Sequence, residues 1–266
     1  MVDFTHSVKN QQAPVAYCEI SAMHSRLELL FVCPDAGKSR RLCEKVEKMV
    51  QEESFEFDRH VPDGPTARLN SSPGRVALGE DLFFALELCE KFRSLTGGYF
   101  DVAALSEDKT RPAYHLFPES HEAAMAGEGH LIDFGGFAKG FALESVRKLL
   151  VGEGITDALL NFGNSSVVGM GKHPFGSCWK VRSEEGGRTF ELKDSAFSIS
   201  GLSRSGKDHI MDPHSAAPAA AGPRVAVSGR SALLCEILST AVYAAPMGER
   251  DRIMESFGGY ILTYGS

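Results

Sequence analysis

Residues 131–140 read LIDFGGFAKG, a short apolar run that ends at Asp133 and meets a pair of glycines ahead of a predicted helix. Gly135 and Gly136 carry no Cβ, so they can adopt positive φ and bring the backbone close to a ligand. Lys139 stands at the start of the helix, where free N–H groups attract anions. The pattern indicates a phosphate ester, such as a nucleotide, as ligand. An ordinary turn between a strand and a helix remains the alternative.

The composition restricts the class of protein. The chain has 266 residues, 43% of them hydrophobic, which suits a globular protein with a substantial core. Its formal net charge is −7 and it contains no dense block of Lys or Arg, which argues against general nucleic-acid binding. The six cysteines are scattered without a CxxC pair. We therefore expect reduced, mostly buried thiols and neither a zinc site nor a disulfide framework.

The sequence shows no targeting or membrane signal. The N-terminal stretch MVDFTHSVKNQQAPV lacks the apolar core of a secretion signal, and no later stretch is long and uncharged enough for a transmembrane segment. As written, the chain is expected to be cytoplasmic. A mature form after export would look the same, so that alternative stays open.

The order of the predicted elements favours an α+β fold. Residues 15–33 suit one or two strands, and apolar residues at helical spacing predict helices over 36–53 and 79–95. Residues 105–130 are polar and contain Pro, so we expect an irregular excursion there. Later strands are predicted near 157–169, 178–183, 188–193, 196–200, 208–211, 224–229 and 260–264, with helices over 141–152, 231–245 and 248–256. Strands and helices mix without regular βαβ alternation, which favours α+β over a doubly wound fold.

A second site signal is a carboxylate inside an apolar helix. Residues 231–248, SALLCEILSTAVYAAPMG, contain one formal charge, Glu236, and an ionised carboxylate buried alone is strongly unfavourable. Thr240 lies one helical turn further on the same face. Its hydroxyl and the carboxylate together predict a site for Mg²⁺, completed by ligand phosphates and water. The alternatives are that Glu236 pairs with a Lys or Arg or faces solvent, and that Thr240 bonds its own helix backbone.

Several segments, in order along the chain, resemble the ApbE family of flavin transferases (FAD:protein FMN transferases). They are TARLN (66–70), TGGYFDVAA (96–104), IDFGGFAKGFALE (132–144), ALLNFGNSSVVGMG (158–171), FSISG (197–201), HIMDPHSAAP (209–218) and LLCEILSTAVYAA (233–245). Ordered matches of this kind are more specific than any one segment. The resemblance implies a single domain over 1–266, with mixed, largely antiparallel sheets packed with helices and an excursion at about 105–130.

The resemblance also implies a reaction. FAD would be split at its pyrophosphate with the help of Mg²⁺, FMN would pass to a Ser or Thr hydroxyl of an acceptor protein, and AMP would be released. Water can replace the acceptor hydroxyl, so hydrolysis of FAD is a related expectation. FAD is then the substrate, Mg²⁺ the cofactor and the acceptor protein the partner.

The resemblance assigns roles to individual residues. The implied metal ligands are the backbone carbonyl of Ala138 and the side chains of Glu236 and Thr240. The residues expected to contact FAD are Asn70, Asp101, Gly135, Gly136, Lys139, Ser200 and Gly201. Of these, the glycine pair and the lysine would face the phosphates. His209, near the reacting phosphate, is the candidate for acid/base or positioning work.

Each assignment has a local structural alternative. Asp101 is also typical of a helix or turn cap, and Asn70 of a residue that braces its own turn. Lys139 is also typical of a solvated lysine at a helix start. A histidine ahead of a strand, as His209 is, often has a purely structural place.

The chain departs from the family pattern in three places. It has Glu236 where the family usually has Asp, its central segment is shorter than usual, and it shows no lipoprotein signal. Mg²⁺ requires near-ideal octahedral geometry, so the extra methylene of Glu236 leaves a second function open. That alternative is a degenerate, non-catalytic protein that binds flavin or another nucleotide. Without a lipoprotein signal, any acceptor is expected in the cytoplasm.

Overall fold

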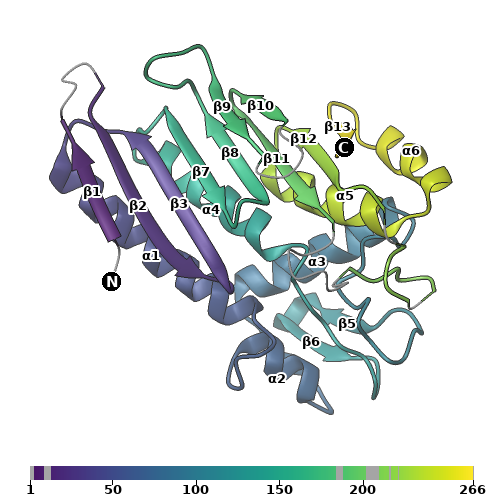
Figure 1. Cartoon of the computed structure of the whole chain (residues 1–266). Helices are drawn as coiled ribbons and strands as arrows, with labels where there is room; N and C mark the ends of the chain where they lie inside the picture. The colour runs from purple at the N-terminus through teal and green to yellow at the C-terminus, as the bar shows by residue number, and fades with distance from the viewer. Residues whose placement is uncertain are drawn as a thin grey trace.

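An eight-stranded antiparallel sheet is the centre of the fold (Figure 1). Its strand order is β1-β2-β3-β7-β8-β11-β12-β13, and every neighbouring pair is antiparallel. The strands are β1 (Asp3–Ser7), β2 (Val15–Ala22), β3 (Ser25–Val32), β7 (Ala158–Phe162), β8 (Ser166–Met170), β11 (Ser195–Ser200), β12 (Val225–Gly229) and β13 (Ile261–Tyr264). The computed structural model describes residues 3–8, 13–183, 188–201, 210–215, 217–220 and 222–265.

One face of this sheet packs against three helices, and buried and more exposed residues alternate along the strands accordingly. In β2, Ala16, Cys18 and Ile20 are buried, whereas the residues between them are partly exposed. The helices on this face are α1 (Ala36–Phe57), α4 (Ala138–Gly152) and α5 (Ala232–Ala244) (Figure 1). Apolar side chains of the sheet and the helices form the main core between them.

A short hairpin covers part of the opposite face. It consists of β9 (Trp179–Arg182) and β10 (Thr189–Leu192), which pair with each other in an antiparallel ladder. The hairpin forms a second, smaller core with the sheet, made of Val167, Trp179, Phe190, Leu192, Phe197 and Ala226. The sheet is therefore buried on both faces where β8, β11 and β12 lie.

A small second sheet lies below the large one in Figure 1. Its order is β4-β6-β5, with β4 (Val76–Ala77), β6 (Glu122–Met125) and β5 (Tyr114–Phe117), and the 3-10 turn η1 (Pro118–Ser120) joins β5 to β6. The remaining helices are α2 (Pro65–Ser71), α3 (Glu80–Leu95) and α6 (Met247–Glu255).

The predicted α+β class with largely antiparallel sheets is confirmed. Residues 105–130 differ from the expected irregular excursion, because β5 and β6 pair there into a hairpin. Each strand has only four residues, too few for a clear alternation in the sequence. The helix α2 was also not predicted, although Pro65 at its first turn is a helix-start signal.

Two further expectations concern the thiols and the membrane. All six cysteines are free, as predicted; five are buried and Cys178 is partly exposed. Among the described residues, no helix has both the length and the apolar character needed to cross a membrane.

Candidate functional site

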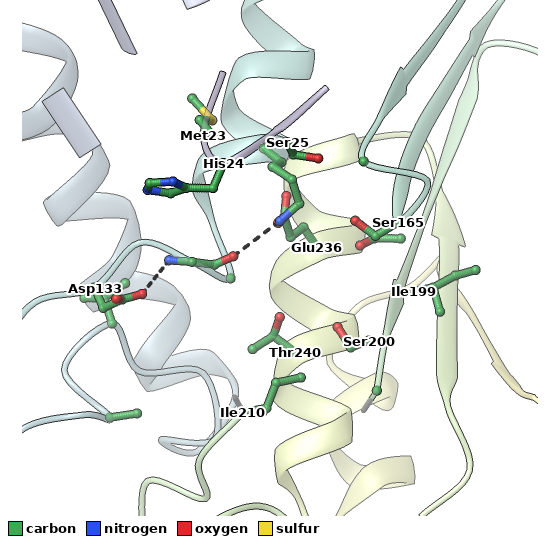
Figure 2. A pocket seen from close by; sticks show the side chains of 18 of the residues that line it. Met23, His24, Ser25, Asp133, Ser165, Ile199, Ser200, Ile210, Glu236 and Thr240 are labelled. Carbon is green, nitrogen blue, oxygen red and sulfur yellow. Dashed lines mark hydrogen bonds and ion pairs between the residues drawn. The ribbon is translucent and has the colours of Figure 1, made fainter. Parts of the chain in front are cut away.

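A deep pocket opens between the ends of the central strands and the helices α4 and α5. Its volume is about 1230 Å³, above the roughly 300–1,000 Å³ of most small-molecule sites, so it can take a large ligand. Figure 2 shows Met23 and His24 on one side and Ile210 on the other, with Glu236 and Thr240 of α5 between them. The pocket thus combines segments from the beginning, middle and end of the chain.

Most of the predicted site residues line this one pocket. They are Asp101, Gly135, Gly136, Lys139, Ser200, Gly201, Glu236 and Thr240. They come from the loop after α3, the turn before α4, the first turn of α4, the end of β11 and the inner face of α5. The fold therefore gathers residues that are far apart in the sequence.

Two of the predicted residues that the structure describes, Ala138 and Asn70, do not line the pocket. Ala138 is buried and borders a smaller cavity of about 170 Å³. Asn70 forms two hydrogen bonds with the backbone of Ile132, at 2.8 and 2.9 Å, and so holds α2 against the irregular segment before the glycine pair. His209 lies outside the described residues.

The carboxylate of Glu236 is paired with the ammonium of Lys139. The Lys139 Nζ atom lies 2.9 Å from Glu236 Oε1, and the backbone N–H of Gly140 donates to Oε2. The Glu236 side chain is only 4% exposed, so burial strengthens its need for these partners. The sequence predicted a cation at this carboxylate, and in the structure Lys139 supplies one. Both side chains nevertheless face the pocket.

The donor set around Glu236 fits a hard cation that takes its remaining ligands from phosphate and water. Glu236 and Thr240 present a carboxylate and a hydroxyl to the same pocket, and within the described residues the Thr240 hydroxyl has no hydrogen-bond partner. A Cβ at Gly136 would lie 3.0 Å from Thr240 Oγ1, so the glycine keeps this oxygen accessible. No cluster of three or more His, Cys, Asp or Glu side chains suited to a metal occurs in the described part of the chain. Mg²⁺ bound with substrate phosphates does not need one.

The turn before α4 is held by a second ion pair. Asp133 accepts a hydrogen bond from the N–H of Gly135 at 2.8 Å, and its other oxygen lies 2.5 Å from Arg59 Nε. The carbonyl of Gly135 lies 3.4 Å from Lys139 Nζ. These contacts fix the turn that the sequence predicts to face phosphates. Arg59 was not predicted, because nothing in the sequence connects it with Asp133.

The sequence model of the ApbE family matches residues 17–261. The chain belongs to the ApbE family. No curated protein matches its sequence.

Solved structures of this family share the fold of the chain. The flavin transferase ApbE of Vibrio cholerae superposes with a TM-score of 0.77 at 16% identity, over 100% of this chain and 98% of that one. An ApbE protein of Thermotoga maritima gives 0.81 at 19% identity, over 95% and 96%. The apo flavinyl transferase ApbE of Pseudomonas stutzeri gives 0.79 at 18% identity, over 94% of each chain.

In this ApbE-family chain, Asp101 is a turn cap that also lines the pocket. It caps a turn by accepting from the N–H of Ala103 at 2.8 Å, and its other oxygen lies 2.7 Å from Arg111 Nε. Its side chain is 5% exposed, yet it lines the pocket. Arg111 belongs to the segment 105–130, so Asp101 ties that segment to the edge of the pocket.

The hydroxyl of Ser200 connects β11 with α5. It lies 2.9 Å from the hydroxyl of Ser239, which in turn lies 3.3 Å from Ser198 Oγ. Ser239 is also within 3.1 Å of the carbonyl of Glu236. These buried hydroxyls set the rotation of α5, so that Glu236 and Thr240 face the pocket.

Two aromatic side chains that line the pocket of this ApbE-family chain were not predicted from the sequence. Among the described residues that line it, Tyr99 and His24 carry the aromatic side chains. Tyr99 lies with its ring centroid 4.5 Å from that of His214, and burial raises the pKa of its phenol. His24 pairs with Asp58 at 2.9 Å. It stands in the two-residue turn between β2 and β3, where Met23 and His24 both have positive φ, of 50° and 55°.

Proposed function

We propose that this chain is a flavin transferase that cleaves FAD and attaches FMN to a Ser or Thr of an acceptor protein, with release of AMP. The observation that carries the proposal is the meeting of two sets of groups in one pocket. Glu236 and Thr240 provide hard oxygen donors, and Lys139 and the Gly135 turn provide partners for phosphates. The structurally similar proteins of Vibrio cholerae and Pseudomonas stutzeri, a flavin transferase and a flavinyl transferase by name, support transfer of a flavin.

The residues that line the pocket support a dinucleotide as substrate. Tyr99 lines it together with apolar side chains such as Leu105 and Ile210, while His24 and Arg59 line it next to Met23. Ring systems bind well against aromatic and apolar side chains. A pocket with rings and an anion-binding turn between its walls suits a molecule with aromatic groups on both sides of a pyrophosphate.

The residues present define what the protein contributes to the reaction. The acceptor hydroxyl oxygen forms a bond to the phosphorus of the FMN part, the bond from that phosphorus to the AMP oxygen breaks, and the hydroxyl proton passes to a base. Glu236 and Thr240 would hold Mg²⁺, which supplies charge neutralisation at the pyrophosphate. Lys139 and the backbone of the Gly135 turn orient the phosphates. His209 is our candidate for the base.

A second candidate function is a protein that binds flavin without turning it over. The observation that favours it is the Lys139 ammonium, which already neutralises Glu236 at 2.9 Å. If this ion pair persists when nucleotide binds, the protein keeps flavin but lacks the metal.

The test is incubation of the purified chain with FAD and either Mg²⁺ or EDTA, followed by chromatography of FAD, FMN and AMP. We expect AMP release that depends on Mg²⁺ and is lost in Thr240→Val, while Thr263→Val on the edge strand β13 remains active. A protein adduct with the mass of FMN would identify the acceptor hydroxyl. Intact FAD that stays bound to the protein would favour the binding function and contradict the transferase.

A further inference from the structure

The position that a divalent cation would take at Glu236 is next to an ammonium of the protein itself. Lys139 Nζ lies 2.9 Å from Glu236 Oε1, while the N–H of Gly140 holds Oε2. A metal bound to Oε1 would bring two more positive charges beside Lys139. Like charges at such short range repel strongly where little water screens them. The metal and the lysine therefore cannot both keep their best positions.

We propose that Lys139 and a divalent cation compete for Glu236. In the metal-free protein Lys139 neutralises the buried carboxylate, and metal binding releases the ammonium toward the phosphates of the ligand. The inference rests on the proposed function, because it concerns the metal site of that reaction. In addition, Lys139 alternates between two positions and acts as a positioning residue for both the metal and the phosphates.

The difference in burial between the two partners decides which of them moves. The Glu236 side chain is 4% exposed and fixed on α5, whereas Lys139 is 23% exposed and reaches the pocket through a flexible stem. The turn carbonyl of Gly135 already lies 3.4 Å from Lys139 Nζ, so a polar partner exists on the phosphate side. A short movement of the lysine head would transfer its charge from Glu236 to the region of the turn.

The competition has a consequence for binding. Metal affinity is reduced in the absence of nucleotide, because binding must first displace Lys139. A ligand with a pyrophosphate group accepts the released ammonium, so metal and pyrophosphate should strengthen each other's binding. A lysine that only contacts phosphate would have no effect on metal affinity when nucleotide is absent.

The experiment measures Mn²⁺ binding without nucleotide, by electron paramagnetic resonance of the free ion. Lys139→Met should bind Mn²⁺ roughly tenfold or more tightly than the unmodified chain, a typical size for coupling between two bound groups. The matched control is Lys148→Met, which removes an exposed lysine from the same helix α4 and should leave the affinity unchanged. Lys139→Gln, which keeps a hydrogen-bond donor near Glu236, serves if the Met variant does not fold. Mn²⁺ should also raise the melting temperature of Lys139→Met more than that of the unmodified chain.

The outcomes separate this inference from the proposed function. Equal or weaker Mn²⁺ binding by both Lys139 variants would overturn the competition, while metal-dependent AMP release could still hold. Absence of Mn²⁺ binding in every variant would overturn the competition, while the metal dependence of the proposed reaction is tested separately by AMP release with Mg²⁺ or EDTA. Tighter binding in both variants, without AMP release in the assay, would support the competition and reject the transferase.

Discussion

At the scale of single residues, Glu53 of α1 is a buried carboxyl group that the proposed reaction does not use. Within the described residues its Oε2 atom has no hydrogen-bond partner. Burial raises the pKa of Glu53 from 4.5 to about 7, and the negative charges of Asp81 and Glu56 add to the rise, whereas a hydrogen bond with Ser145 opposes it. The folded protein therefore favours the protonated form of this side chain.

This raised pKa predicts a pH-dependent stability. Because the folded state holds its proton more tightly, the contribution of Glu53 is most favourable below pH 4.5 and is lost as the pH rises toward about 7. The full difference is about 3 kcal/mol for a shift of this size. Glu53→Gln should therefore flatten the loss of unfolding free energy between pH 5 and 8, measured by urea denaturation. Glu44→Gln, an exposed change on the same helix, should keep the slope of the unmodified chain.

The turn between β2 and β3 gives a second prediction for single residues. Met23 and His24 both have positive φ, a conformation that glycine and asparagine adopt at lower energy. The double substitution Met23→Asn with His24→Gly should raise the unfolding free energy by about 1 kcal/mol or more. The same double variant should bind FAD more weakly, since both side chains line the pocket. Unchanged affinity in a titration of flavin fluorescence would show that the turn is not part of the ligand site.

At the scale of elements, the packing of α4 on α5 depends on one glycine. A Cβ at Gly140 would lie 2.8 Å from both Glu236 Oε2 and the Cα of Leu233, so the two helices approach closely only because it is absent. The same approach lets the N–H of Gly140 bind Glu236. The site and the helix packing therefore rely on the same contact.

Gly140→Ala tests this packing. We expect it to lower the unfolding free energy by about 1–3 kcal/mol through overpacking, and to weaken metal binding, because α5 and Glu236 must shift. Gly152→Ala lies at the other end of α4, where a Cβ would meet nothing within 4 Å. That control should be neutral or stabilising by about 0.5–1 kcal/mol. Equal stabilities of the two variants in urea denaturation would contradict the role of the close contact.

The helices and strands also show which parts of the structure can be predicted from the sequence. The helix α1 follows from hydrophobic periodicity, and most strands of the central sheet were predicted from short apolar runs, whereas β1 was not. The helix α5 is buried around most of its circumference and was predicted from its almost continuous apolar character. The need of Glu236 for a cation was predictable from its apolar helix. That Lys139 supplies it was not, because the pairing depends on how α4 crosses α5. The contacts of Arg59 and Arg111 with pocket carboxylates escaped prediction for the same reason.

At the scale of the whole molecule, the pocket is built from segments that are distant in the chain. Its walls include the β2–β3 turn, the start of α4 and the helix α5. A ligand there contacts segments that come together only in the folded chain. Binding should therefore stabilise the molecule as a unit and not only the residues nearby.

This coupling between ligand binding and folding predicts that ligand raises the melting temperature. FAD with Mg²⁺, at about 100 times its dissociation constant, should stabilise the fold by roughly 2.7 kcal/mol. For a chain of this size, that corresponds to a rise in melting temperature of about 5–10 °C by differential scanning fluorimetry or calorimetry. Riboflavin, which lacks the pyrophosphate, should give a smaller shift. Equal shifts with both compounds would argue against the anion-binding role of the turn before α4.

The positions of the thiols allow unfolding of the chain to be followed by chemical labelling of its cysteines. Cys178 is the partly exposed thiol, beside β9, and the other five cysteines are shielded in the interior. A thiol reagent should thus label one site in the native protein, while the remaining sites react only when the core opens. The rate of this slower labelling would measure opening directly, without attaching any probe to the pocket.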